Sequence, residues 1–202
     1  MKDKKPILML LTALAVASSL SHAADNAAVM KAMQTCSICH GIDGNSTSPA
    51  FPRLAGQQAP YLEAQLKAFR DHTRADQDAQ DYMWGWAAPL NDQTIKELAT
   101  YYAAQKPLPG KQTDPATMER GKRIYEGGIP SQNIPACAAC HGQNAQGNKN
   151  FPRLAGQHAS YLIKQLKVFH SQERPAAIAM HEIVKTLTPE EMEAVAAYLQ
   201  SK

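Results

Sequence analysis

Apolar residues recur with the period of a helix in two stretches that lie far apart in the chain. In each stretch four apolar side chains stand at i, i+3, i+4 and i+7, the spacing that places them on one face of an α-helix. The positions are Ile95, Leu98, Ala99 and Tyr102 in the first stretch and Met192, Val195, Ala196 and Leu199 in the second. The pattern predicts two amphipathic helices, one in each half of the sequence.

Capping residues mark where these and other helices begin. The segment Thr188–Glu191 (TPEE) reads as a capping box with proline in the first turn, and Asn91 is the matching N-cap candidate in the first half. The pair Asp114–Pro115 predicts another helix start, and Gly127–Gly128 predicts its end. Two further helices are expected, over residues 61–69 and 161–169. Because no stretch alternates apolar and polar residues, the fold class is predicted to be all-α.

The same motifs occur twice in the same order. The heptapeptide FPRLAGQ occupies residues 51–57 and again residues 151–157, and each copy is followed by Tyr-Leu and Gln-Leu-Lys. Each copy is preceded by a C-x-x-C-H-G segment, at residues 36–41 and 137–142. Two complete copies indicate an internal duplication.

The duplication predicts two tandem domains joined by a short linker. Proline, glycine and polar residues cluster without apolar periodicity in the segment 106–114. We therefore expect a first domain over residues 24–107, a linker over 108–113 and a second domain over 114–202.

The first 23 residues have the layout of a secretory signal peptide. Three lysines precede an apolar run over residues 7–20, and Ser21-His22-Ala23 offers a cleavage site with small flanking residues. A retained membrane anchor is the competing interpretation, but the run is shorter than the roughly 20 residues that a spanning helix needs. The sequence thus predicts cleavage after Ala23 and a location in the periplasm.

Removal of this segment leaves a nearly neutral protein. The whole chain carries a formal charge of +3, and residues 1–23 contribute three lysines and one aspartate, so the remainder is +1. A nucleic-acid-binding protein needs a concentrated basic face, and this composition argues against one.

The paired C-x-x-C-H motifs carry the predicted chemistry. Two cysteines three positions apart can each form a thioether with a haem vinyl group, and the adjacent histidine then supplies the proximal ligand to iron. A redox dithiol would not explain the histidine in both copies, and a four-cysteine zinc site would require the two pairs to come together. The sequence therefore predicts two covalently bound haem c groups, held by Cys36, Cys39, His40, Cys137, Cys140 and His141.

The sixth iron ligand is predicted to be a methionine in each copy. Met83 stands eight residues before Asn91, and Met180 stands eight residues before Thr188, each on an irregular segment ahead of the final helix. A thioether is a soft ligand that raises the reduction potential. Four histidines without a matching partner in the other copy are rivals for this role, namely His72, His158, His170 and His181.

The paired motifs resemble those of the cytochrome c4 family, exported dihaem proteins built from two class I cytochrome c domains. The resemblance covers residues 24–202 and implies that His40 with Met83, and His141 with Met180, ligate the two irons. It also implies that a carbonyl at Pro52 and at Pro152 accepts a hydrogen bond from the proximal imidazole. Arg53 and Arg153 are candidate partners of a haem propionate, because a guanidinium suits that contact.

The expected function is electron transfer without catalysis. With His and Met on each iron no coordination position is left for a substrate, so we expect a carrier and no enzyme. The resemblance implies redox-protein partners, an inner-membrane quinol-oxidising complex as donor and a terminal oxidase as acceptor, with membrane association through these partners. A dihaem subunit of a periplasmic dehydrogenase, such as a flavoprotein sulfide dehydrogenase, is the alternative, and a dihaem peroxidase or thiosulfate-oxidising enzyme is a second one.

A cluster of four aspartates suggests that the two haems differ in potential. The residues Asp71, Asp76, Asp78 and Asp81 crowd the segment that leads to Met83, and a solvated loop is the simpler interpretation of this composition. Negative charge stabilises ferric iron, so the hypothesis is that the first haem has the lower potential.

Overall fold

The computed structural model describes residues 27–202 and is built from helices. Over this range only two isolated β-bridges occur and no strand forms, so the all-α prediction is confirmed. No helix between residues 27 and 202 is long and apolar enough to cross a membrane. The expected signal peptide, residues 1–23, lies outside the described residues.

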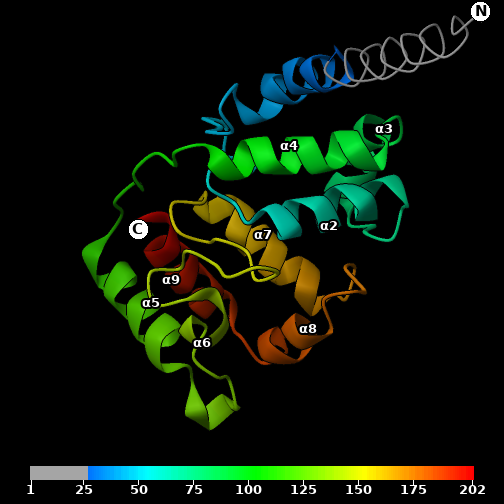
Figure 1. Ribbon diagram of the computed structural model, residues 1–202. Coiled ribbons are helices and arrows are strands. Elements are labelled where there is room, and N and C mark those ends of the chain that lie inside the picture. The colour runs from blue at the N-terminus through cyan, green and yellow to red at the C-terminus, as the bar shows by residue number, and fades with distance from the viewer. Residues whose placement is uncertain (1–26) are drawn as a thin grey trace, which may run out of the picture.

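The chain forms two helical units, one above the other in the view of Figure 1. The upper unit opens with a helix over residues 27–40. Its other elements are α2 (Ala59–Arg70), η1 (Ala79–Met83), α3 (Trp84–Ala87) and α4 (Asp92–Ala104). The lower unit comprises α5 (Pro115–Gly127), η2 (Pro130–Gln132), α6 (Ala138–His141), α7 (Ala159–His170), α8 (Ile178–Val184) and α9 (Pro189–Gln200).

The segment between α4 and α5 crosses from one unit to the other without regular structure. It is nevertheless fixed at both ends, because Leu108 N donates to Asn45 Oδ1 at 2.9 Å and Lys111 N donates to Gln200 O at 3.0 Å. We propose that the boundary between the two domains lies in this segment.

The capping residues expected from the sequence begin the helices in the structure. Asn91 accepts a hydrogen bond from Thr94 N at the start of α4, and Asp114 accepts one from Thr117 N at the start of α5. Thr188 and Glu191 form the complete capping box of α9, each side chain bonding to the backbone of the other residue. Gly128, at φ 70°, ends α5 as predicted.

The first and last helices of the lower unit cross in close contact. A Cβ atom on Gly121 of α5 would lie 1.9 Å from the carbonyl oxygen of Ala194 on α9, so only glycine allows this approach. Tyr125 on the same helix is completely buried, and its hydroxyl donates to Gly142 O at 2.6 Å. This crossing anchors α5 beside α6, the element that carries the second C-x-x-C-H motif.

The segments that carry the two methionines are helical, and the expectation of irregular structure there was wrong. Met83 is the last residue of the π-helix η1, and Met180 lies in the seven-residue α-helix α8. The wider π turn accommodates the longer segment of the first unit, in which nine positions separate Arg74 from Met83 and six separate Arg174 from Met180. Both methionines are thereby held by backbone hydrogen bonds.

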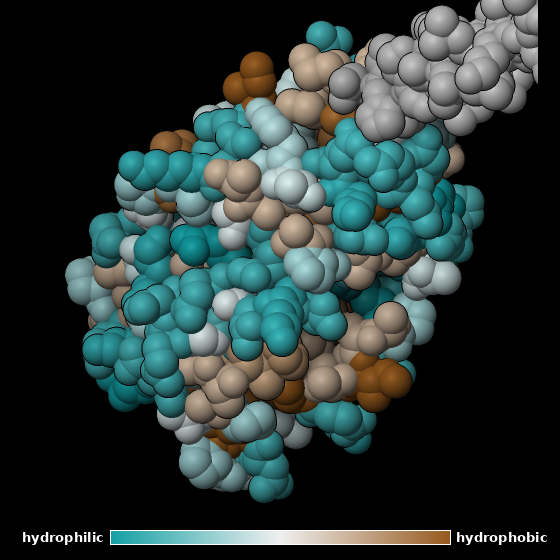
Figure 2. Space-filling view, viewed as in Figure 1, coloured by the Kyte–Doolittle hydropathy of each residue, from teal (hydrophilic) through white to brown (hydrophobic). Residues whose placement is uncertain are grey.

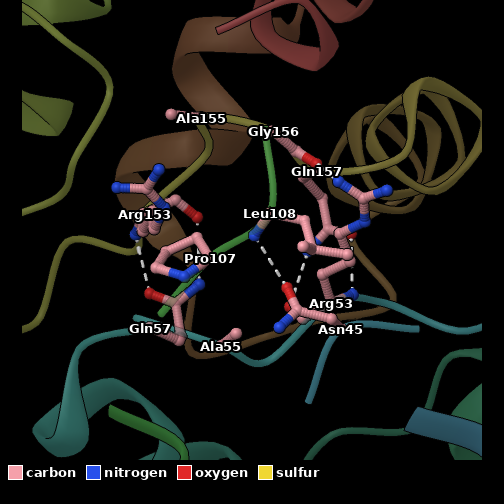
Figure 3. A pocket seen from close by; sticks show the side chains of 10 residues that line it. All are labelled: Asn45, Arg53, Ala55, Gln57, Pro107, Leu108, Arg153, Ala155, Gly156 and Gln157. Atoms are coloured by element: carbon pink, nitrogen blue, oxygen red, sulfur yellow. Dashed lines mark hydrogen bonds between the residues drawn. The ribbon is translucent and has the colours of Figure 1, made fainter. Parts of the chain in front are cut away.

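The two units contact each other through their repeated FPRLAGQ loops (Figure 3). The side-chain amide of Gln157 accepts from Arg53 N at 2.9 Å and donates to Arg53 O at 2.9 Å. The side chain of Gln57 makes the same pair of bonds with Arg153, at 2.7 and 2.9 Å. Each glutamine thus binds the backbone of the other unit, and the two halves are related by approximate two-fold symmetry.

Candidate functional site

Each C-x-x-C-H motif lies at the end of a helix. Cys36, Cys39 and His40 occupy the last turn of helix 27–40, while Cys137 precedes α6 and His141 ends it. All four cysteines lie in the described residues and form no disulfide with one another. Burial raises the pKa of Cys36 above its ordinary value and that of Cys137 to about 11, so both sulfur atoms are neutral at neutral pH.

The two motif histidines have equivalent surroundings. His40 Nδ1 donates to Pro52 O at 2.9 Å, and His141 Nδ1 donates to Pro152 O at 3.0 Å. Burial lowers the pKa of each histidine, and the hydrogen bond to the proline carbonyl opposes this shift. The neutral ring is the form that binds iron, and with Nδ1 occupied the ring is oriented to offer Nε2.

The FPRLAGQ loops hold the proline carbonyls against the histidines. In the first unit Gly44 O accepts from Leu54 N and Ala55 N, and in the second Ala145 O accepts from the equivalent atoms of Leu154 and Ala155. The Phe51 ring meets the His40 ring edge-on at 6.2 Å, and Phe151 meets His141 in the same way at 6.2 Å. The same loops therefore orient the histidines and join the two units.

Both methionines are half-buried among apolar side chains. Met83 packs with Phe69, Ala79, Ala87 and Trp84, and Met180 packs with a cluster that includes Val184, Leu187 and Met192. In the view of Figure 2 the surface is mainly hydrophilic, but apolar side chains gather low in the picture, over the region of α6 and α8. The second histidine and the second methionine come from these two elements.

The residue after each methionine donates a ring N–H to a backbone carbonyl. Trp84 Nε1 donates to Arg74 O at 2.9 Å, and His181 Nε2 donates to Arg174 O at 2.9 Å. The Nε2 atom of His181, a rival to Met180 as iron ligand, is therefore already hydrogen-bonded. Of the other rivals, His158 Nε2 donates to Ser46 O at 2.9 Å, His72 is exposed and stacks on Trp84, and His170 is exposed.

The two arginines of the FPRLAGQ loops have different surroundings. Arg53 Nη1 donates to Gly156 O at 2.9 Å and its Nε to Ser46 O at 3.3 Å, so its guanidinium joins the two units. Arg153 Nε is buried and has no hydrogen-bond partner within residues 27–202, and burial lowers the pKa of this guanidinium. Of the two propionate candidates, only Arg153 presents a buried donor that still needs an acceptor.

Sequence reasoning missed the residues that form the polar centre of the interface. Arg74 and Arg174 are buried there, and their guanidinium groups share the side-chain oxygens of Gln65 and Gln165. The sequence does contain a sign of them, because Arg74 and Arg174 are identical residues one hundred positions apart. Gln57 and Gln157 are related in the same way.

The aspartate cluster beside Met83 is largely neutralised. Asp71 pairs with Arg70, Asp76 with Arg74, and Asp78 with Lys164 of the other unit. Asp81 alone is without a recorded cation among the described residues, and its carboxylate accepts from Gln77. These pairings weaken the field on which the hypothesis of a lower potential for the first haem depends.

The donor set in each unit fits a covalently bound haem. Two thiols, one oriented neutral imidazole and one thioether are the groups that would attach a c-type haem and bind its iron. Arg153 Nε supplies a buried donor suited to a propionate. A shared metal centre of another kind is not built, since no cluster of three His, Cys, Asp or Glu side chains forms within residues 27–202.

Comparison with known proteins relates both units to one family. The family model described as Cytochrome c matches residues 24–104 and 118–202. Among curated proteins, cytochrome c-552 of Acidithiobacillus ferridurans is 44% identical over 92% of this chain and 81% of its own. Cytochrome c4 of Azotobacter vinelandii is 36% identical over 97% of this chain and 98% of its own.

A solved structure and one further relative extend the comparison. The cytochrome c4 structure from Acidithiobacillus ferrooxidans matches with a TM-score of 0.78 and 46% identity, over 83% of this chain and 98% of that one. The thiosulfate dehydrogenase electron acceptor of Thiomonas intermedia is 36% identical over 83% of this chain and 78% of its own.

Proposed function

We propose, from the premise that this chain belongs to the cytochrome c family as a two-domain protein of the cytochrome c4 type, that it is a periplasmic carrier in a respiratory chain. It is a dihaem electron-transfer cytochrome with one covalently bound haem c in each half. We further propose which residues hold each haem and which redox proteins are the partners of the chain in the periplasm.

Each half supplies its own complete set of attachment groups. Cys36 and Cys39 form the thioethers of the first haem, and Cys137 and Cys140 those of the second. His40 and His141 are the proximal ligands, each oriented by the proline carbonyl that its Nδ1–H contacts at 2.9 or 3.0 Å. This repeated histidine–carbonyl contact is the observation that carries the proposal, because it leaves the same ring nitrogen available in both halves.

Met83 and Met180 supply the sixth ligands. Both thioethers are held on short helices among apolar side chains, and a thioether ligand would favour the ferrous state of a bound iron. The iron supplies one-electron chemistry, while the protein fixes the ligands so that little reorganisation accompanies each transfer. With a histidine and a methionine as ligands, each iron would have no position left for a substrate, which favours a carrier over an enzyme.

The quantity that tests this assignment is carbon monoxide binding by the reduced protein, measured with haem quantified per chain. Two haems and an unchanged spectrum support closed His–Met ligation at both irons. A carbon monoxide adduct in the wild-type protein would contradict it and favour an enzyme with an open site.

Substitution of one methionine gives a sharper version of the test. Met83→Ala should open one haem, so that carbon monoxide binds to half of the total haem, and Met180→Ala should open the other half. Met118→Ala is the control, since this methionine lies outside both ligand segments and should leave both haems closed. Carbon monoxide binding unchanged by Met83→Ala would exclude Met83 as a ligand.

The partners are redox proteins, and we propose a quinol-oxidising complex as donor and a terminal oxidase as acceptor. Reduction of the purified protein by membranes supplied with quinol, followed by oxidation through an added terminal oxidase, is the expected result. Membranes that reduce it only through another soluble carrier would contradict this position in the chain.

A second candidate role is suggested by one relative. The protein of Thiomonas intermedia bears the name thiosulfate dehydrogenase electron acceptor. In this role the present chain accepts electrons from such a dehydrogenase instead of a quinol-oxidising complex. Stopped-flow reduction by a thiosulfate dehydrogenase with thiosulfate, compared with reduction by the quinol-oxidising complex, decides between the two donors.

A further inference from the structure

Two chemically different side chains occupy the same structural role beside the two methionines. Trp84 follows Met83 and His181 follows Met180, and each donates a ring N–H to the carbonyl of an arginine, Arg74 or Arg174, at 2.9 Å. The two arginines are equivalent at the one-hundred-residue offset, whereas the two donors are not alike in sequence. A contact that two different residue types both provide points to a requirement for the ring donor at that place.

The two arginines are themselves fixed at the contact between the units. Gln65 Oε1 accepts from Arg74 Nη1 at 2.9 Å and from Arg174 Nη2 at 2.7 Å. Gln165 Oε1 accepts from Arg174 Nη1 at 2.7 Å and from Arg74 Nη2 at 3.0 Å. The four side chains therefore close a ring of hydrogen bonds between the two units.

Aromatic contacts hold each guanidinium from the other side. The Arg74 guanidinium lies 4.6 Å from the centre of the Phe69 ring, and that of Arg174 lies 4.6 Å from the centre of the Phe169 ring. Phe69 also packs in the cluster that contains Met83, and Phe169 packs in the cluster that contains Met180. Each arginine thus contacts the residue after its methionine through its backbone carbonyl, and its side chain contacts a phenylalanine that packs in the same cluster as that methionine.

We propose that Trp84 and His181 are positioning residues for the two axial methionines, and that the ring of Arg74, Gln65, Arg174 and Gln165 ties both methionine segments to the domain interface. The proposal rests on the ligand role of Met83 and Met180 given above. A connected path then leads from Met83 through Trp84 and Arg74, across the ring, to Arg174, His181 and Met180.

The physical reason lies in the weakness of a thioether as a ligand. A segment that holds such a ligand must keep the sulfur in place, because displacement competes directly with ligation. The methionine segments are short, since η1 has five residues and α8 has seven, and helices of this length have little stability of their own. The bond from the ring N–H to the arginine carbonyl supplies a fixed point outside the helix.

The first test removes one donor without removing the ring. Trp84→Phe keeps an aromatic side chain but cannot donate to Arg74 O, while Trp86→Phe is the matched control because Trp86 is exposed and two positions away. Titration of the ferric holoprotein with imidazole, which displaces methionine, gives one binding constant for each haem. We expect Trp84→Phe to raise the affinity of one haem by about threefold to tenfold, the range that one lost hydrogen bond allows.

The outcome is read together with a spectroscopic signature. The absorption band of methionine-ligated ferric haem should weaken in Trp84→Phe and stay at the wild-type intensity in Trp86→Phe. Trp84→His, which places the donor of the second unit in the first, should restore both the band and the wild-type affinity. Equal behaviour of Trp84→Phe and Trp86→Phe would overturn the positioning role, as would failure of Trp84→His to restore a property that Trp84→Phe has lost.

The second test addresses the ring that joins the units. Gln65→Leu removes an acceptor shared by both arginines, so imidazole affinity should rise at both haems instead of one. Gln93→Leu, on the exposed face of α4, is the control. A change confined to the first haem in Gln65→Leu would overturn the tie between the segments.

Failure of this inference is distinguishable from failure of the ligand assignment. If the wild-type ferric protein lacks the methionine band at either haem, the ligand assignment fails before any variant is made. If the wild-type band is present at both haems and Trp84→Phe leaves it unchanged, only the positioning role fails.

Discussion

In the two haem sites, the hydrogen bonds of a histidine side chain decide which of its ring nitrogens remains free to bind iron. The bond from His40 Nδ1 to Pro52 O directs Nε2 toward a ligand, and the bond from His181 Nε2 to Arg174 O removes that nitrogen from competition. Two histidines therefore differ in role because a different ring nitrogen is hydrogen-bonded in each.

Gly121 offers a residue-scale prediction for stability. Gly121→Ala would place a methyl group 1.9 Å from the carbonyl oxygen of Ala194, so α5 and α9 would have to move apart. We expect a loss of about 1–3 kcal/mol or more in the free energy of unfolding, measured by urea denaturation. Gly127→Ala on the same helix is the control, since no atom of the described residues lies within 4 Å of its new methyl group. Similar stability of the two variants would contradict the close crossing.

The sequence predicted the motif residues because each motif is local. The C-x-x-C-H segments and the capping residues need only a few neighbouring positions to be recognised. Arg74, Arg174, Gln65 and Gln165 went unrecognised because their meaning depends on two units meeting, which no local spacing encodes. Arg53, which the sequence made a candidate partner of a propionate, donates from its guanidinium to Gly156 O of the other unit, a contact that likewise depends on two units meeting.

At the scale of elements, helix ends position the chemistry. The two motif histidines end helices, and the final helix of each unit starts at a defined cap. The methionine segments were expected to be irregular because they are too short for apolar periodicity to emerge and lie close to proline or glycine. Their helical form comes from packing against the rest of each unit, with the longer segment accommodated by a π turn.

The capping box of α9 gives a prediction at this scale. Thr188→Ala removes the side chain that accepts from Glu191 N. Of the two bonds of the capping box, only the one from the backbone N–H of residue 188 to the Glu191 side chain can then form. The expected cost is about 1 kcal/mol in the free energy of unfolding of the holoprotein. Thr100→Ala, exposed within α4, should cost less, because a helix interior favours alanine over threonine. A larger loss in Thr100→Ala than in Thr188→Ala would refute the capping role.

At the scale of the whole molecule, the contact between the units contains a titratable residue. His158 belongs to the second unit, is buried, and donates Nε2–H to Ser46 O of the first unit. Burial lowers the pKa of His158, the bond to Ser46 O opposes this shift, and the charge of Arg53 adds to the lowering. The equivalent position in the first unit is Gln58, which donates to Gln146 O at 2.9 Å and does not titrate.

The pH dependence follows from the direction of this shift. A histidine whose pKa is lower in the folded protein than its ordinary value of about 6.5 contributes fully above that value. Its contribution is lost as the pH falls through about 6.5 toward the lowered pKa, because the unfolded chain then binds the proton more readily. His158→Gln should remove this part of the acid sensitivity.

Urea denaturation of the holoprotein at about pH 7.5 and about pH 5 measures the effect. The wild-type protein should lose more stability between the two values than His158→Gln does. The exposed His170 provides the control variant His170→Gln, whose pH dependence should follow the wild-type protein. Identical pH profiles for wild type and His158→Gln would exclude His158 as the source.

The reciprocal bonds of Gln57 and Gln157 show what type of contact joins the two halves of the chain. Each glutamine grips the same backbone position of the opposite unit, which is the form of an isologous contact between identical subunits. One FPRLAGQ loop therefore contains both halves of this contact, so a single domain that carries it could pair with a second identical domain. Because both copies lie in one chain here, the contact is intramolecular and does not depend on the concentration of the protein. The symmetry is not complete, because Arg53 and Arg153 are alike in sequence but differ in their hydrogen bonds.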